Sequence, residues 1–256
     1  MKHGFTVLEL AIVIVIIALL VGGVLVGRSL VAAATIKNYT ASLDRYNSGA
    51  ATFRLKYKAL PGDIRPGEAM VYGMVSRTGE SGHGDGNGLL EGCAQNSQRL
   101  GCETALFWRD MWEGGVSPLG VTLATDIPVD GTVPGFRIED YLPITPFRPG
   151  SYTYAYMLHG RNSFYLSTIT SVANDGTLTT SAGITPLEAR SIDDKIDDTA
   201  PDNGIVRAMS DLSTYDNGAT PAAGVCVNNT LSTLAYNVLE AYENNITCQV
   251  SIRSSL

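Results

Sequence analysis

Few side chains in this sequence have the types and spacing that enzyme catalysis needs. Histidine occurs only at His3, His83 and His159, and no G-x-S-x-G or H-E-x-x-H motif accompanies it. The set of motifs that marks a protein kinase is also missing from the sequence. We therefore expect that the chain is not an enzyme and has no catalytic or cofactor-binding residues.

The four cysteines are the clearest set of reactive groups, and their chemistry is disulfide formation. No two of them have the C-x-x-C spacing of a structural zinc site or a redox dithiol. An even number of cysteines beyond an N-terminal apolar segment indicates an oxidising compartment. Three pairings are possible. We favour Cys93–Cys102 and Cys226–Cys248, because each pair closes a local loop and contributes about 3 kcal/mol.

The carboxylate of Glu9 stands one residue before a long apolar run. From Leu10 to Gly27 no residue is charged. A helix of that length reaches about 27 Å, which is close to the hydrocarbon thickness of a bilayer. An ionised carboxylate drawn into lipid costs a few kcal/mol unless a partner neutralises it. The sequence therefore predicts a membrane-spanning helix, with Glu9 as a functional residue that meets a positive group.

A secretory signal peptide is the alternative for this segment, since Lys2 and His3 precede the apolar run as a positive n-region would. The run is longer than the roughly 7–15 residues usual for a signal peptide. No A-x-A cleavage site closes it before Arg28. These features favour the membrane anchor.

The first nine residues are MKHGFTVLE, and the apolar run follows them. This combination resembles the class III leader of type IV pilins and type II secretion pseudopilins. The resemblance implies that a membrane-bound prepilin peptidase cleaves after Gly4 and that Phe5 becomes an N-methylated first residue. It also implies that the new amine pairs with Glu9 of a neighbouring subunit. Two such charges that neutralise each other in apolar surroundings fix register more than they add stability.

The resemblance further implies a structural subunit, major or minor, of a type IV pilus-type filament. Its partners would be other pilin subunits in a homo- or hetero-filament, the prepilin peptidase, an inner-membrane assembly platform and, before assembly, the lipid bilayer. The location would be the bacterial inner membrane, crossed once with the head in the periplasm, and then the pilus at the cell surface. The alternatives are a type II secretion pseudopilin, and a single-pass membrane-anchored periplasmic binding module or enzyme.

The overall charge argues against one further class of partner. The formal net charge is -7, whereas binding to nucleic-acid phosphates requires clustered lysine and arginine. We therefore do not expect nucleic acid as a partner.

An amphipathic stretch continues the apolar run and predicts one helix from about Phe5 to Leu60, about 80 Å long. Residues 5–28 would form its transmembrane or filament-core half and residues 29–60 its amphipathic half. A coiled coil has the same spacing, but aromatic residues on the apolar face favour packing on a sheet. The sequence LPGD at positions 60–63 predicts a type II turn that ends the helix. The apolar face comprises Ile36, Tyr39, Leu43, Tyr46, Ala50, Phe53, Tyr57 and Leu60.

The remaining residues, 61–256, are expected to form a globular head after a leader at residues 1–4. The fold class predicted for the chain is α+β and pilin-like, in which the long helix packs on a small antiparallel sheet with additional helices and loops. A helix is predicted over 103–113, with Leu106, Phe107, Met111 and Trp112 in the core and Arg109, Asp110 and Glu113 in solvent.

Alternating tyrosines predict a hairpin of strands at 151–157 and 163–169, followed by a short strand at 177–180. A capping box at Thr185–Glu188 starts a helix that runs to about Ile196. The proline-rich residues 116–149 are expected to form surface loops. We expect an edge strand at 248–253. A last helical face is predicted at Leu231, Leu234, Ala235, Val238, Leu239 and Tyr242.

The glycine-rich residues 79–92 suggest an ion-binding loop only weakly. Asp85 and Asn87 match the start of a calcium loop, but Leu89 occupies the fifth place and the rule of glycine at the sixth fails. The G-x-x-x-x-G-K-[ST] order of a phosphate-binding loop is also missing. A plain flexible turn is the favoured interpretation.

The motifs LPGD, GDGNG and IDDKIDD with PDNG resemble in their layout a group of pilin-like proteins. By that resemblance the acidic residues could ligate calcium through oxygen, as some pseudopilin heads do near their C-termini. A solvated acidic helix end is the simpler interpretation, so we expect no cofactor, with structural calcium as the alternative. The candidate ligands are Asp193, Asp194, Asp197, Asp198 and Asp202.

Overall fold

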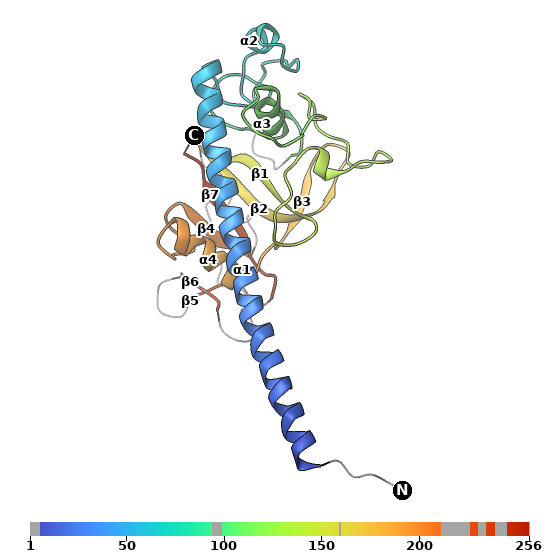
Figure 1. The fold of residues 1–256 in the computed structure, drawn as a ribbon. Helices are drawn as coiled ribbons and strands as arrows, with labels where there is room; N and C mark the ends of the chain where they lie inside the picture. Colours follow the sequence, from blue (N-terminus) through green and yellow to red (C-terminus); the bar gives the residue numbers. More distant parts are fainter. Residues whose placement is uncertain are drawn as a thin grey trace. The chain divides into compact units, whose positions relative to one another are not determined.

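The computed structural model describes residues 6–93, 99–158, 160–210, 226–229, 234–238 and 245–255. The chain divides into two compact units, Met1–Asn38 and Tyr39–Leu256. The layout is α+β, with a long apolar N-terminal helix and a small antiparallel sheet (Figure 1). The α+β class expected from the sequence is therefore confirmed.

Helix α1 spans Val7–Tyr57, 51 residues, and agrees with the predicted helix to within three residues at its C-terminal end. The side chains of its first part, residues 7–34, are exposed. Among the described residues, α1 is the helix long and apolar enough to cross a membrane, with a mean hydropathy of 3.1 in its most apolar window. Length and composition thus support the predicted membrane anchor.

The helix ends where Lys58 adopts a left-handed conformation with φ +59°. The Lys58 amide donates to the Arg54 carbonyl oxygen at 2.9 Å, as in a left-handed helix cap. The predicted type II turn follows. The Asp63 amide donates to the Leu60 carbonyl oxygen at 3.2 Å, and Gly62 has the positive φ, +89°, that the third place of this turn requires.

Within the second unit, the apolar face of α1 packs on the sheet and on a second helix. The Tyr46 ring lies 4.9 Å from the Trp108 ring and 5.9 Å from the Phe164 ring, measured between centroids. Thr153 Oγ1 donates to the Tyr39 hydroxyl at 3.4 Å. This face therefore meets the sheet, as predicted, and is not the seam of a coiled coil.

The sheet has the strand order β1-β2-β7-β4, with β3 pairing against the C-terminal end of β2 (Figure 1). All pairs are antiparallel. The predicted hairpin and short strand are confirmed. The strand expected at the C-terminus is also confirmed, but its predicted edge position is wrong, because β7 lies between β2 and a four-residue strand, β4, that the sequence pattern did not reveal. The strands are β1 Ser151–Leu158, β2 Arg161–Val172, β3 Leu178–Ser181, β4 Val206–Met209 and β7 Gln249–Arg253.

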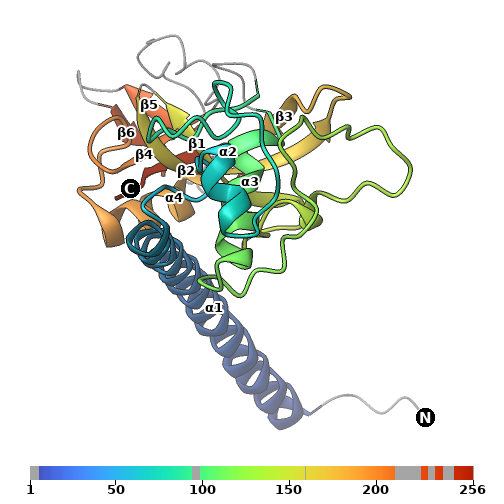
Figure 2. The same cartoon turned by 90° about the horizontal axis from the view of Figure 1, so that it is seen from above.

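Helix α3, Cys102–Glu113, lies against β1 (Figure 2) and matches the predicted helix to one residue. Its predicted faces need two corrections. Trp112 is 42% exposed, and Trp108 is fully buried in its place among the rings of Tyr46 and Phe164. Asp110, which was expected in solvent, is also fully buried.

Three further helical segments complete the described head. They are α2 Pro66–Val71, the 3-10 helix η1 Ile138–Asp140 and α4 Pro186–Ile196. The α4 helix begins with the predicted capping box, in which Thr185 Oγ1 accepts from the Glu188 amide at 3.2 Å and Glu188 Oε2 accepts from the Thr185 amide at 2.8 Å. The strong local signal of this motif explains why the start of α4 was predicted correctly.

The helix predicted near the C-terminus is wrong at residues 234–236. Strand β6, Leu234–Tyr236, pairs there with β5, Val227–Asn229. The strand satisfies its backbone through this pairing, and the Asn237 amide continues it by donating to the Cys226 carbonyl oxygen at 2.9 Å. The predicted Leu231, Leu239 and Tyr242 lie outside the described residues.

A buried ion pair explains the position of Asp110. Arg77 Nη2 lies 2.8 Å from Asp110 Oδ1, Arg77 Nη1 lies 3.0 Å from Oδ2, and neither side chain is exposed. The Gly62 amide also donates to Asp110 Oδ2, at 2.7 Å. The pair thus joins the turn after α1, the Arg77 loop and α3. A Cβ at Gly62 would lie 2.5 Å from the Glu103 carbonyl oxygen, so this junction admits only glycine.

We expect Asp110→Asn to lower the free energy of unfolding by about 3–5 kcal/mol, because it leaves the buried Arg77 guanidinium without its counter-charge. The matched control is Glu113→Gln on the same helix. Glu113 forms a partly exposed pair with Arg109, and its loss should cost less than about 1 kcal/mol. Unfolding of the full chain in detergent micelles, followed by near-ultraviolet circular dichroism, measures both. Equal effects of the two substitutions would contradict a structural role of the buried pair.

Candidate functional site

The N-terminus of α1 carries a reciprocal hydrogen-bond pattern between Thr6 and Glu9. Glu9 Oε2 accepts from the Thr6 amide at 2.8 Å and from Thr6 Oγ1 at 2.9 Å. The Glu9 amide donates back to Thr6 Oγ1 at 3.2 Å. This is a capping box, in which side chains satisfy amides that the first helical turn leaves without partners.

The capping box determines where the Glu9 carboxylate points. It accepts a hydrogen bond from the Thr6 nitrogen, and Thr6 is the residue that directly follows Phe5 in the sequence. A negative group at this end also interacts favourably with the helix dipole. Gly4 and Phe5, the predicted cleavage and methylation residues, lie outside the described residues. Glu9 thus lies at the entrance to an exposed apolar helix, turned toward the N-terminal side.

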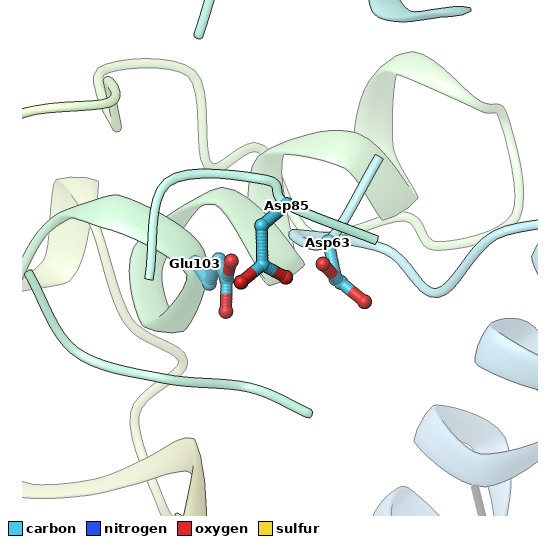
Figure 3. A group of neighbouring side chains, drawn as sticks. All are labelled: Asp63, Asp85 and Glu103. Atoms are coloured by element: carbon cyan, nitrogen blue, oxygen red, sulfur yellow. The ribbon is translucent and has the colours of Figure 1, made fainter. Parts of the chain in front are cut away.

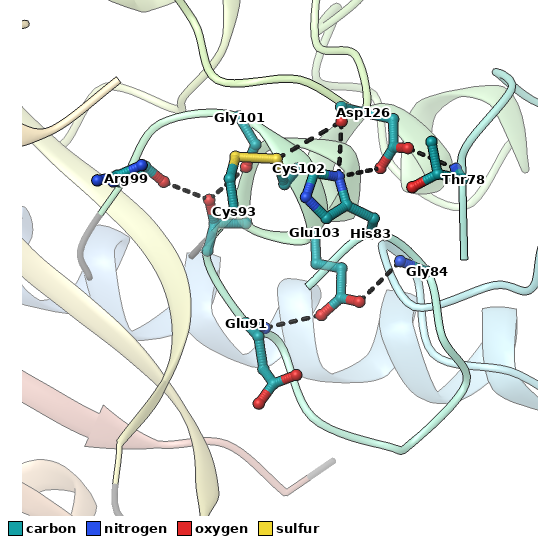
Figure 4. The surroundings of a disulfide bond; sticks show 11 residues. Thr78, His83, Gly84, Glu91, Cys93, Arg99, Gly101, Cys102, Glu103 and Asp126 are labelled. Atoms are coloured by element: carbon teal, nitrogen blue, oxygen red, sulfur yellow. Dashed lines mark hydrogen bonds and ion pairs between the residues drawn. A yellow bond between two sulfur atoms is a disulfide. The ribbon is translucent and has the colours of Figure 1, made fainter. Parts of the chain in front are cut away.

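The structure contains both disulfides, Cys93–Cys102 and Cys226–Cys248, with Cα–Cα distances of 5.3 and 5.0 Å. The first lies at the N-terminus of α3 (Figure 4), and the second joins the segment before β5 to the segment before β7. No cysteine is free. These sulfurs therefore stabilise the head and do not offer a thiolate nucleophile.

His83 lies near the first disulfide and contacts Asp126 (Figure 4). His83 Nδ1 is 2.8 Å from the Asp126 carbonyl oxygen and 3.1 Å from its Oδ1. The Thr78 amide donates to the other carboxylate oxygen, Oδ2, at 2.6 Å. A histidine oriented by an aspartate can act in hydrolysis, but the neighbouring sulfurs are bonded to each other. The contacts of this pair hold the Thr78 and Asp126 loops together.

Two buried carboxylates, Asp63 and Glu103, lie close to the half-buried Asp85 of the glycine-rich loop (Figure 3). Asp63, Asp85 and Glu103 each place one carboxylate oxygen within 4.8 Å of the others. Asp63 is 2% exposed and Glu103 is not exposed at all. Burial raises the pKa of Glu103 to about 8 and that of Asp63 to about 6.

The loop satisfies these carboxylates through its backbone. Asp63 accepts from the amides of Gly86 at 2.6 Å and Gly88 at 2.7 Å. Glu103 accepts from the amides of Gly84 and Glu91, both at 2.8 Å. The sequence had indicated a plain flexible turn and did not identify Asp63 or Glu103 as its partners. The available signal was the glycine-rich loop itself, whose exposed amides require acceptors.

Of the five aspartates predicted as calcium ligands, the structure brings three together. Asp193, Asp197 and Asp198 each place one carboxylate oxygen within 4.8 Å of the others. Asp194 and Asp202 are exposed and do not belong to this group. The acidic cluster formed by Asp193, Asp197 and Asp198 lies at the C-terminal end of α4.

The members of this acidic cluster differ in how they are satisfied. The Tyr236 hydroxyl donates to Asp193 Oδ2 at 2.7 Å, whereas Asp193 Oδ1 is buried and has no hydrogen-bond partner in the described part of the chain. Burial, together with the smaller effect of the nearby charges of Asp197 and Asp198, raises the pKa of Asp193 to about 6. Asp197 Oδ2 accepts from the amides of Ile205 and Val206.

Comparison with known proteins assigns no function to either group of carboxylates or to the N-terminal capping box. No family model matches the chain, and no curated protein or solved structure matches it. The function is therefore argued from the residues and their geometry.

The raised pKa of Glu103 predicts a stability that falls as pH rises. The unfolded chain loses the proton near the ordinary value of 4.5, whereas the folded chain keeps it until about pH 8. Between these values the unfolded state binds fewer protons, so the stability declines by up to about 1.4 kcal/mol per pH unit. Thermal unfolding of the full chain in detergent, measured from pH 5 to 8, should show this decline.

Glu103→Gln should make the decline shallower, because the substituted side chain does not titrate. Glu113→Gln on the same helix serves as a control and should keep the slope of the unmodified chain, since Glu113 is exposed. A Glu103→Gln slope as steep as that of the unmodified chain would show that Glu103 does not retain its proton.

Proposed function

We propose that this chain is a subunit, major or minor, of a type IV pilus-type filament that a prepilin peptidase processes after Gly4. The observation that carries the proposal is the position of Glu9 in a capping box at the start of an exposed apolar helix. The motif MKHGFTVLE supports the cleavage site and the identity of the new N-terminus.

The apolar part of α1 requires apolar surroundings that the single chain does not supply in its described part. Its side chains between positions 7 and 34 are exposed, and a continuous apolar surface of this kind is stable in lipid or against other apolar helices, but not in water. Before assembly a lipid bilayer provides these surroundings, and after assembly the α1 helices of neighbouring subunits provide them. If each subunit contacts the next through two different surfaces, and these contacts do not close into a ring, the subunits form a helical filament.

Glu9 can mediate the change from one environment to the other. Within the described residues of the single chain, local hydrogen bonds from Thr6 stabilise its carboxylate. A neighbouring subunit that presents the new amine of Phe5 supplies a full positive charge, which neutralises the carboxylate and fixes the axial position of the two helices. The paired charge is also far less costly in apolar surroundings than the isolated carboxylate.

The head fits an exported subunit. Its two disulfides require an oxidising compartment, such as the bacterial periplasm on the far side of the inner membrane. The partners in this proposal are other pilin subunits, the prepilin peptidase and the inner-membrane assembly platform. A type II secretion pseudopilin would share the same processing and assembly, and imaging of surface fibres in a deletion strain separates the two.

The processing step is tested by mass spectrometry of the protein from its native membrane or filament. The expected mature chain begins at Phe5 and carries one methyl group on its amine. Detection of an intact Met1 in the assembled protein, or of cleavage near Ala34, would contradict the proposal and favour a tethered module or a secreted protein.

The role of Glu9 is tested by Glu9→Ala, with Asp44→Ala on an exposed part of the same helix as the control. We expect Glu9→Ala to be cleaved normally but to enter filaments at least about tenfold less well, since a few kcal/mol of charge pairing is lost. The control should assemble normally. Normal assembly of Glu9→Ala would exclude the proposed charge pairing.

A further inference from the structure

An open cleft in the head is lined by three segments of the chain. Its volume is about 440 Å³, within the range of about 300–1,000 Å³ that is typical of small-molecule sites. The lining residues are Gly131 and residues 136–139 from the segment before β1, Tyr152 of β1, and residues 170–172 of β2. The cleft is therefore separate from the N-terminal capping box and from both groups of carboxylates described above.

A glycine allows the segment before β1 to approach β2 closely at this cleft. The Gly131 amide donates to the Ala173 carbonyl oxygen at 3.2 Å. A Cβ at Gly131 would collide with the backbone and side chain of Val172. Only glycine permits this contact, which fixes one end of the cleft.

A β-bulge in β2 shapes another part of the cleft. The pairing of β2 with β3 shifts its register between Ile169 and Ser171, so Thr170 is an extra residue in β2. Neighbouring residues of a regular strand point to opposite faces, whereas Thr170 and Ser171 are both exposed and both line the cleft. Thr170 Oγ1 donates to the Thr179 carbonyl oxygen at 3.0 Å, which leaves this oxygen able to accept a hydrogen bond. The bulge thus brings two neighbouring hydroxyl-bearing residues to one cleft.

A buried tyrosine orients the carboxylate of Glu139 at the cleft. The Tyr152 hydroxyl donates to Glu139 Oε1 at 2.6 Å, and Tyr152 is 4% exposed. This hydrogen bond lowers the pKa of Glu139, so the carboxylate is ionised at neutral pH. Its second oxygen, Oε2, lies 3.8 Å from Arg137 Nε. The cleft therefore presents a carboxylate beside a guanidinium, with opposite charges that offset each other.

We propose that this cleft binds a neutral saccharide. A sugar carries neighbouring hydroxyl groups that both donate and accept hydrogen bonds, and the donors of Arg137 and the acceptors of Glu139 match such a pair. Phe136 also lines the cleft, and its ring centroid lies 5.7 Å from that of Tyr141. The negative face of an aromatic ring attracts the carbon-bound hydrogens on the apolar face of a sugar ring. The lining residues therefore combine the polar and the aromatic contacts that a sugar requires.

The charges at the cleft favour a neutral ligand over an anionic one. Arg137 is the one basic residue among the described residues that line the cleft, and Glu139 offsets its charge. A nucleotide or another phosphate ligand would require clustered lysine and arginine. The proposed saccharide site goes beyond the filament role and does not depend on it, since all the lining residues belong to the head.

Binding is tested with the full chain in micelles of a detergent that has no sugar head group, because such a head group would compete for the cleft. The chain is first applied to an array of neutral and anionic oligosaccharides. The neutral oligosaccharide that binds best is then titrated, and its contacts are measured by saturation-transfer NMR. We expect saturable binding of neutral oligosaccharides, with saturation transferred to the carbon-bound protons of a sugar ring.

The variants Glu139→Gln and Phe136→Leu should each weaken this binding by at least about tenfold, because the first removes the charged acceptor and the second removes the aromatic face. Arg137→Ala should weaken binding to a similar extent. Arg137 is exposed, so its variant remains informative if the other two do not fold. The matched control is Glu80→Gln, which makes the same change at an exposed residue outside the cleft and should bind as the unmodified chain does.

Three outcomes would overturn the proposal. The first is that no neutral oligosaccharide on the array binds above background. The second is stronger binding of anionic oligosaccharides than of neutral ones. The third is equal affinity in Arg137→Ala, Glu139→Gln and Glu80→Gln, which would show that any bound sugar lies outside the cleft.

Discussion

The head of this protein depends on buried carboxyl groups whose oxygen atoms are hydrogen-bonded by partners from other segments. Asp110 meets the guanidinium of Arg77 and the amide of Gly62, while Glu103 receives two amides from the glycine-rich loop. A buried carboxylate that lost such partners would cost on the order of several kcal/mol. Each one therefore fixes the segments that surround it, in a part of the head that has little regular secondary structure.

The same physical constraint applies at the N-terminus, with a different solution. Glu9 has no buried environment in the single chain and takes its hydrogen bonds from Thr6 in the first helical turn. These local bonds orient the carboxylate but leave its charge without a counter-ion in the described chain. The apolar helix beyond it is exposed as well. Both features point to an environment that only lipid or another subunit supplies.

Composition alone does not decide what a group of acidic residues does. The cluster around Asp63 and the cluster around Asp193 contain three carboxylates each at similar spacing. In the first, glycine amides of the loop satisfy both oxygens of Asp63 and one oxygen of Glu103, while Glu91 and Asn87 supply the remaining donors. In the second, one oxygen of Asp193 remains without a partner. The number of amides available in the surrounding chain makes this difference.

The sequence by itself determined the features that arise from neighbouring residues. Hydrophobic spacing predicted the long helix, the Thr185–Glu188 capping box predicted the start of α4, and alternating tyrosines predicted the hairpin, because each signal acts within a few residues. The N-terminal candidate Glu9 was also found from its local context. Only the tertiary structure decided that Asp110 is buried, since its partner Arg77 lies 33 residues away. It also decided that residues 234–236 form a strand, because that strand depends on pairing with the separate segment β5, which no local pattern of the sequence indicates.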